Sequence, residues 1–196
     1  MANESKIVTL KNGYHVWTRK EGHGPIKILL LHGGPGMDHE YLEPFSNYIK
    51  MHPNIEIIYY DQLGSYFSDQ PNDPKLWTIP RFIEEIEEVR KAWNLDQFYL
   101  YGQSFGGLFA LEYAASKYGK HVKALIDSNM VDSYQDYAKY INKYRESMDP
   151  ADVSYMKKQE ERHNYDDPHY QELLMKLYHR CICRISPWPD AVQRTF

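Results

Sequence analysis

The sequence has few cysteines and no long apolar segment. Among its 196 residues are two cysteines, Cys181 and Cys183, which are too close together for an ordinary disulfide and too few for a zinc cluster. The longest wholly aliphatic run, residues 28–31, is far short of the roughly 20 apolar residues that span a bilayer, and the first residues contain no signal-peptide core. We therefore expect reduced thiols, no membrane segment and a cytoplasmic location.

An excess of charge of one sign is also absent. The 23 Lys and Arg residues stand against 27 Asp and Glu residues, a net charge of −4, which argues against a basic nucleic-acid binder and against a disordered acidic tail. Gly and Pro, at 11 each, are too few for a collagen-like or linker chain. With 42% apolar residues and 18 tyrosines, which suit half-buried helix faces and pocket walls, a packed globular protein is expected.

Short apolar runs alternate with helical patterns up to about residue 129. Asn-Gly at positions 12 and 13 joins two β-type runs, 7–10 and 14–17, which predicts an N-terminal hairpin. Four later runs are typical of strands buried on both faces of a parallel sheet: 26–31, 55–60, 98–101 and 122–126. Strands that alternate with helices predict an α/β fold with a mostly parallel sheet.

The clearest helical pattern lies between the second and third of these four strands. It places four apolar side chains on one stripe: Phe82, Ile86, Val89 and Trp93. Four glutamates interleave with the stripe and are expected on a solvated helix face: Glu84, Glu85, Glu87 and Glu88.

From residue 132 onward the pattern is helical only. One apolar stripe combines Tyr134, Tyr137, Ile141 and Tyr144, and a further helix follows the Asp-Pro pair at 167 and 168. We therefore divide the chain into an α/β core, residues 1–131, and a helical subdomain, residues 132–196. The tyrosine stripe favours packing inside the subdomain, and the alternative is that some of its rings line a small apolar pocket.

Residues 102–107 carry the strongest chemical pattern in the chain, Gly-Gln-Ser-Phe-Gly-Gly. They lie between a predicted strand and a predicted helix at 108–116, which is the context of the G-x-S-x-G turn. A serine at such a turn takes a strained backbone conformation that exposes its hydroxyl, and the flanking glycines allow strand and helix to approach. Ser104 is thus the candidate nucleophile, and the Phe105 N–H is the candidate donor to a developing oxyanion.

Residues 32–36, His-Gly-Gly-Pro-Gly, follow the first long buried strand. Acyl transfer needs two donors on the tetrahedral oxygen, and the second commonly comes from the loop after this strand. We select Gly34 as this donor, with Gly33 as the next choice, and expect His32 to brace the loop. Two such loops at the carboxyl ends of parallel strands lie where ligand sites form in α/β proteins.

Four segments together resemble the proline iminopeptidase branch of the α/β-hydrolases. They are residues 32–36, 60–65 (Tyr-Asp-Gln-Leu-Gly-Ser), 102–107 and 167–172 (Asp-Pro-His-Tyr-Gln-Glu), and the resemblance covers essentially the whole chain. It implies an α/β-hydrolase core and a serine aminopeptidase without metal or other cofactor. Such an enzyme releases an N-terminal residue, preferably proline, from short peptides with a free N-terminus through an acyl-enzyme.

The resemblance also assigns roles to residues. Ser104 is the nucleophile, and Gly34 and Phe105 are the oxyanion donors. Asp61 and Gln62 hold the loop beside the site. In this loop Leu63 and Tyr66 replace the Arg and Gly that are common in the family. The resemblance therefore does not determine the substrate pocket.

The sequence does not place the histidine base and the acid. In α/β-hydrolases these follow the nucleophile, and the resemblance implies that the sequence stops inside the helical lid, before the strands that carry them. Asp127 and Asp132 are alternative acids, although a turn or cap role is favoured for each. His163, His169 and His179 lie in amphipathic helices and are not expected to act as the base or to bind a metal.

Two other functions stay open. The altered loop at Leu63 and Tyr66 favours a different α/β-hydrolase, such as an esterase, lactonase or amidase. The unplaced base and acid favour a noncatalytic fragment or interaction domain that keeps the fold. The sequence does not determine the oligomeric state.

Overall fold

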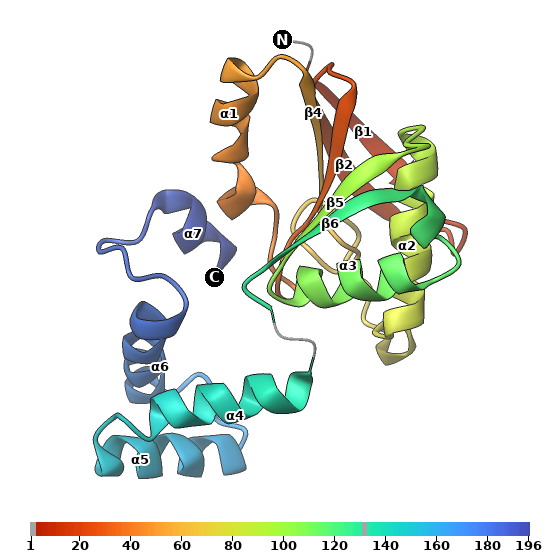
Figure 1. Ribbon diagram of the computed structural model, residues 1–196. Helices are drawn as coiled ribbons and strands as arrows, with labels where there is room; N and C mark the ends of the chain where they lie inside the picture. Colours follow the sequence, from red (N-terminus) through yellow and green to blue (C-terminus); the bar gives the residue numbers. More distant parts are fainter. Residues whose placement is uncertain (1–2, 131–132) are drawn as a thin grey trace. The chain divides into compact units, whose positions relative to one another are not determined.

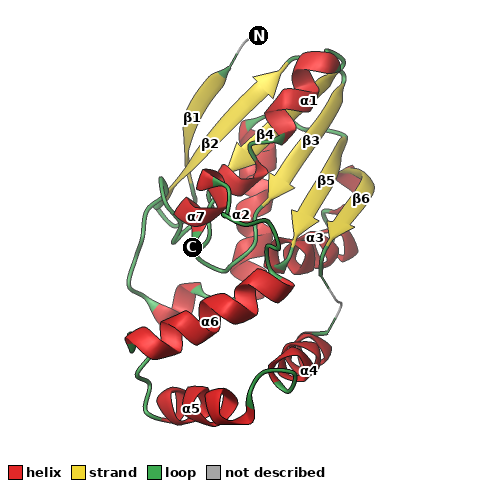
Figure 2. Ribbon diagram, turned by 90° about the vertical axis from the view of Figure 1, so that its left-hand side faces the viewer, coloured by secondary structure: helices red, strands yellow, loops and turns green. Residues whose placement is uncertain are grey.

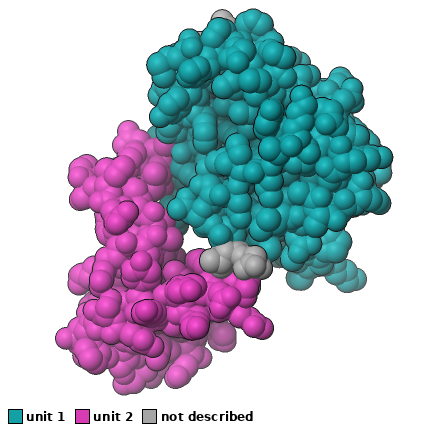
Figure 3. Space-filling view, viewed as in Figure 1, with its two compact units in different colours: residues 1–132, 194–196 teal, residues 133–193 magenta. Residues whose placement is uncertain are grey.

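A computed structural model describes residues 3–130 and 133–196, and of Tyr134 it describes the backbone only. The chain forms two compact units (Figure 3), residues 1–132 with 194–196, and residues 133–193. Asp132, one of the alternative acids, lies outside the described residues.

The first unit contains a six-stranded sheet in the order β1-β2-β4-β3-β5-β6 (Figure 2). Its strands are β1 (Glu4–Thr9), β2 (His15–Gly22), β3 (Ile26–Leu31), β4 (Ile55–Tyr60), β5 (Phe98–Gln103) and β6 (Val122–Ser128). β2 is antiparallel to β1 and β4, whereas β3–β4, β3–β5 and β5–β6 are parallel. The predicted α/β fold, with a hairpin followed by a mostly parallel sheet, is confirmed.

Helices cover both faces of this sheet (Figure 1). They are α1 (Phe45–Met51), α2 (Ile79–Ala92) and α3 (Phe105–Ala115), with short 3-10 turns η1 (Glu40–Leu42), η2 (Pro74–Leu76) and η3 (Gly119–His121). Side chains alternate along β3, so Leu29 and Leu31 pack in the core under α2 and α3, while Leu30 packs with Ile49 of α1. The central strands are therefore buried on both faces, as their apolar runs predicted.

The edge strand β6 differs from the sequence prediction. We expected residues 122–126 to be buried on both faces, but Ile126 is 46% exposed and most of the strand is open to solvent. β6 is the outermost strand of the described sheet and pairs only with β5. An apolar run therefore does not by itself reveal that a strand lies at the edge of a sheet.

Helix α2 confirms the predicted apolar stripe and corrects the prediction about its glutamates. Phe82, Ile86 and Val89 are buried against the sheet. Glu85 and Glu87 are also buried, at 2% and 3% exposure, so the prediction that all four glutamates face solvent is wrong. The two buried carboxylates have cationic partners on the same helix, which offsets the cost of removing them from water.

The second unit contains α4 (Tyr134–Arg145), α5 (Pro150–Glu161), α6 (Pro168–Cys181) and the first turn of α7 (Asp190–Thr195). Its core is formed by Met156, Tyr170 and Leu173. Tyr137 and Tyr144 are 39% and 46% exposed, so the prediction that the tyrosine stripe of α4 packs inward is wrong for these two rings. No helix of the described chain is long and apolar enough to cross a bilayer.

Candidate functional site

Ser104 lies at the sharp bend between β5 and α3. Its backbone angles, φ 52° and ψ −127°, fall in a region that side-chain-bearing residues rarely adopt. Two backbone bonds hold the bend, from Ser104 N to Ser128 O (2.9 Å) and from Gly107 N to Ser104 O (2.8 Å). The side chain is half-buried, and its hydroxyl makes no hydrogen bond to any described residue. The structure thus presents an unpaired hydroxyl at a strained turn.

Two glycines allow this bend to press against its neighbours. A Cβ on Gly106 would lie 2.4 Å from the Leu31 carbonyl oxygen and 2.5 Å from that of His32. A Cβ on Gly102 would lie 2.4 Å from the Gly106 carbonyl oxygen. Only glycine fits such approaches, so the start of α3 lies directly on the end of β3.

The glycine-rich loop after β3 touches the bend. A Cβ on Gly33 would lie 3.0 Å from the Ser104 Cβ. Gly34 has φ +124°, and a Cβ there would meet the Gly36 nitrogen at 2.6 Å, so both its conformation and its surroundings require glycine. No described residue accepts a hydrogen bond from the Gly34 N–H. The Phe105 N–H, in the first turn of α3, has no acceptor within the helix.

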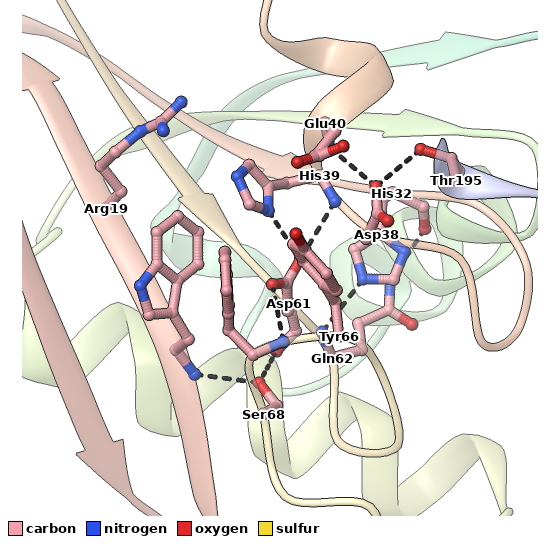
Figure 4. Close-up of polar contacts among 12 residues, drawn as sticks. Arg19, His32, Asp38, His39, Glu40, Asp61, Gln62, Tyr66, Ser68 and Thr195 are labelled. Carbon is pink, nitrogen blue, oxygen red and sulfur yellow. Dashed lines mark hydrogen bonds and ion pairs between the residues drawn. The ribbon is translucent and has the colours of Figure 1, made fainter. Parts of the chain in front are cut away.

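His32 joins the loop after β3 to the loop after β4 (Figure 4). The Gln62 backbone N–H donates to His32 Nε2 (3.0 Å), and the Gln62 side-chain amide donates to the His32 carbonyl oxygen (2.8 Å). Because Nε2 accepts, the ring proton lies on Nδ1, which donates to the Gly33 carbonyl oxygen at 2.8 Å. Burial lowers the pKa of His32, although the charge of Asp61 opposes this, so the ring is a neutral link.

Asp61 organises the loop after β4 from a fully buried position (Figure 4). Its carboxylate accepts from the backbone N–H (3.0 Å) and ring Nδ1 (2.8 Å) of His39, and from the Phe67 N–H (3.3 Å). Its backbone carbonyl accepts from the Ser68 hydroxyl (2.6 Å). The His39 ring in turn stacks on Trp17, with ring centres 4.3 Å apart. Asp61 therefore holds residues 61–68 and the turn at residue 39 together.

An apolar pocket of about 360 Å³ opens beside this loop. It is lined by Pro35, Gly36, Gln62, Leu63, Gly64, Trp77, Thr78, Ile79, Phe82, Phe105 and Phe109. A Cβ on Gly64 would lie 2.8 Å from the Trp77 ring, so the indole rests directly on the loop. No lining residue is charged, and Phe105 directly follows Ser104. The pocket can therefore hold a small apolar group, and Phe105 joins its wall to the bend that carries Ser104.

The structure does not bring a histidine into hydrogen-bond contact with Ser104 among the described residues. His163, His169 and His179 all belong to the second unit.

Asp127, one of the alternative acids, lies at the end of β6 against Gly107. A Cβ on Gly107 would lie 2.1 Å from the Asp127 Oδ1. Burial raises the pKa of the Asp127 carboxyl. The described residues contain no group of three or more His, Cys, Asp or Glu placed to hold a metal ion, and both cysteines are free.

Three residues near the site were missed by the sequence analysis: Tyr41, His39 and Glu85. Each forms a hydrogen bond with a residue more than 20 positions away along the chain. Tyr41 bonds to Gln103, His39 to Asp61 and Glu85 to Leu63. Tyr41 is one of 18 tyrosines and Glu85 one of a run of glutamates, so neither stands out by composition or spacing.

These features are those of the alpha/beta hydrolase fold, and a family model of that description matches residues 27–157; the chain belongs to this family. Among its relatives, the proline iminopeptidase of Elizabethkingia meningoseptica is 45% identical over 193 residues, and that of Flavobacterium johnsoniae 44%. Each match covers 96% of this chain and 64% of the relative. The resemblance to the proline iminopeptidases is thus confirmed, and the chain spans about two thirds of their length.

Two solved structures have a similar fold. The crystal structure of VinJ is 27% identical, with a TM-score of 0.91 over 98% of this chain and 66% of that chain. The crystal structure of the proline iminopeptidase of Mycobacterium smegmatis has a TM-score of 0.81 over the same shares of the two chains, at 24% identity, and supports the fold alone.

Proposed function

We propose that this chain carries the nucleophile part of a serine aminopeptidase that releases N-terminal residues, preferably proline, from short peptides. The observation that carries the proposal is the backbone of Ser104, whose strained bend exposes an unpaired hydroxyl beside the glycine loop. The names of the relatives support the substrate class. Since the chain spans 64% of those relatives, the activity is proposed for the protein at their length, and the base and the acid stay a prediction outside these 196 residues.

In this mechanism the Ser104 hydroxyl attacks the carbonyl carbon of the N-terminal residue. The negative charge that develops on the carbonyl oxygen is stabilised by hydrogen bonds that the Gly34 N–H and the Phe105 N–H donate, the latter at the positive end of α3. The peptide C–N bond then breaks: the Ser104 proton, taken up by the predicted histidine base, passes to the leaving amine, and the N-terminal residue stays attached as an acyl ester of Ser104. Water then attacks this ester, which releases the free residue and restores the Ser104 hydroxyl. No step requires a metal or an organic cofactor.

The apolar pocket supports a preference for a small ring. A pyrrolidine ring is compact and apolar, and the pocket offers the faces and edges of Trp77, Phe82 and Phe105. Leu63, 2% exposed, stands where the family commonly has arginine, so this wall of the pocket is aliphatic.

The test compares proline p-nitroanilide with its N-blocked form on the natural protein. We expect turnover of the free amine only and its loss in Ser104→Ala, with an unchanged urea midpoint. The matched control is Ser5→Ala, an exposed serine in β1, which should keep full activity. Equal turnover of the free and blocked substrates would remove the aminopeptidase claim.

An esterase is the second candidate, favoured by one observation. None of the residues that line the pocket is charged, so within it nothing pairs with a substrate ammonium group. Clear preference for p-nitrophenyl acyl esters over aminoacyl amides would decide for the esterase. Failure of a fluorophosphonate probe to label Ser104 would instead support a noncatalytic role.

We further propose that residues 132–196 form the beginning of a helical lid and that the protein acts in the cytoplasm. The succession of α4, α5 and α6 supports the first proposal. The two free cysteines, which suit a reducing compartment, support the second.

A further inference from the structure

We propose that Tyr41 is a positioning residue that sets the register of the glycine loop against Ser104. Tyr41 lies in η1, and its hydroxyl accepts a hydrogen bond from the Gly33 N–H at 2.7 Å. The same hydroxyl donates to the Gln103 side-chain oxygen at 2.6 Å. Gln103 directly precedes Ser104, so one hydroxyl joins the glycine loop to the strand end that carries the candidate nucleophile. This inference rests on the proposed function.

The directions of these two bonds follow from the groups involved. A backbone N–H can only donate, so the Tyr41 oxygen accepts from Gly33. The single phenol proton is then available for Gln103, whose Oε1 accepts it. Burial raises the pKa of Tyr41 above its ordinary value, and the phenol therefore keeps this proton at neutral pH.

Together with His32, Tyr41 fixes both peptide groups of Gly33. Tyr41 holds the N–H of the peptide between residues 32 and 33. His32 Nδ1 holds the Gly33 carbonyl, which belongs to the next peptide. In a trans peptide the carbonyl and the N–H point in opposite directions, so fixing the Gly33 carbonyl also sets the direction of the Gly34 N–H. The Gly34 N–H is the proposed oxyanion donor and is the one left without a partner among the described residues.

The same bonds separate the roles of the two glycines. The Gly33 N–H is occupied by Tyr41 and is not available to a substrate oxygen. The Gln103 oxygen lies 3.1 Å from the position of a Cβ on Gly33, so the linkage also leaves no room for a side chain there. Tyr41 thus acts on the reaction only through Gly33, Gly34 and Gln103.

Removal of the hydroxyl should therefore affect the transition state more than substrate binding. In Tyr41→Phe the ring stays, but the Gly33 N–H and the Gln103 oxygen lose their partner and the loop can shift relative to Ser104. A displacement on the order of 1 Å at a catalytic centre costs about 100-fold in rate. We expect kcat to fall by about 10- to 100-fold, with KM changed less than about twofold.

The experiment uses the natural protein and three readouts. They are kcat and KM on proline p-nitroanilide, the inhibition constant of a proline boronate that forms a tetrahedral adduct with serine, and that of free proline. In Tyr41→Phe we expect kcat and boronate affinity to fall together while proline binding is kept. The control Tyr48→Phe, at an exposed position of α1, should match the wild type in all three. A parallel loss of proline and boronate binding, or an unchanged kcat, would overturn the proposal.

A second variant and a readout without activity complete the test. Gln103→Met removes the acceptor for the Tyr41 proton, and if both residues act through one linkage the double variant should lose no more than Tyr41→Phe alone. Hydrogen exchange of the Gly33 amide should be faster in Tyr41→Phe than in the wild type, whether or not the protein turns over any peptide. If the wild type is inactive and this exchange still accelerates, the proposed function fails and the positioning inference stands. Unchanged exchange refutes the inference itself.

Discussion

The Glu85 carboxylate accepts a hydrogen bond from the Leu63 N–H at 3.2 Å, and it also pairs with Arg81, one turn earlier on α2. A buried helix side chain is thereby attached to the loop that lines the apolar pocket. Burial raises the pKa of Glu85 to about 7, although the charge of Arg81 and the Leu63 N–H both oppose this. The carboxyl is therefore half-ionised near neutral pH.

This raised pKa predicts a stability that depends on pH. The ordinary pKa of the group is 4.5, so between pH 4.5 and about 7 the folded chain holds the proton more tightly than the unfolded chain does. The contribution of Glu85 to the free energy of unfolding should fall across this window, by on the order of 3 kcal/mol, and level off above it. Glu85→Gln should flatten the change in urea midpoint between pH 5 and pH 7.5. Parallel curves for the wild type and the variant would contradict the assignment.

His32 should be the neutral Nδ1–H tautomer. Nitrogen NMR should show a protonated Nδ1 and an unprotonated Nε2, because Nε2 accepts from the Gln62 N–H. Burial lowers the pKa of His32 below its ordinary value of 6.5, so the folded ring should stay neutral at pH values at which the unfolded chain already binds the proton, and the free energy of unfolding should fall as the pH drops below 6.5. A protonated Nε2 would refute the proposed link between the two loops.

Gly106→Ala should destabilise the first unit. The new methyl group would lie 2.4 and 2.5 Å from the carbonyl oxygens of Leu31 and His32, which are backbone atoms that cannot rotate away. We expect the free energy of unfolding to fall by about 3 kcal/mol, which is the upper end of the cost of overpacking a core. Gly36→Ala is the control, because nothing lies within 4 Å of its Cβ and only its φ of +89° opposes the change, at a cost of about 1 kcal/mol. Urea unfolding measures the free energy of unfolding of both variants. Equal decreases in Gly106→Ala and Gly36→Ala would show that the close contact at Gly106 is not what destabilises the protein.

The exposed strand β6 should make a chain of these 196 residues associate at its sheet edge. Unpaired backbone groups and the 46%-exposed Ile126 offer a template for a second strand. Ile126→Lys should lower concentration-dependent association in sedimentation velocity while the urea midpoint stays constant. Ile185→Lys, at a 62%-exposed position outside the strands, is the matched control and should leave association unchanged. A wild-type chain that is monomeric at high concentration would refute the prediction.

Much of the fold and part of the site could be predicted from the sequence. The run 26–31 and the stripe of Phe82, Ile86 and Val89 identify β3 and α2, because apolar periodicity reports directly which face of an element is buried. The bend at Ser104 could be placed because steric demands on a strand-to-helix turn are local and select glycine at neighbouring positions.

The sequence by itself determined these local features, since each depends on residues within a few positions of one another. The tertiary structure alone decided that Glu85 is buried, that the strands lie in the order β1-β2-β4-β3-β5-β6 and that Tyr41 spans from Gly33 to Gln103. The physical reason is that burial of a charge, the order of strands and a hydrogen bond across 62 positions all depend on which distant segments meet in space. The spacing and composition of residues within one segment do not determine which distant segment packs against it.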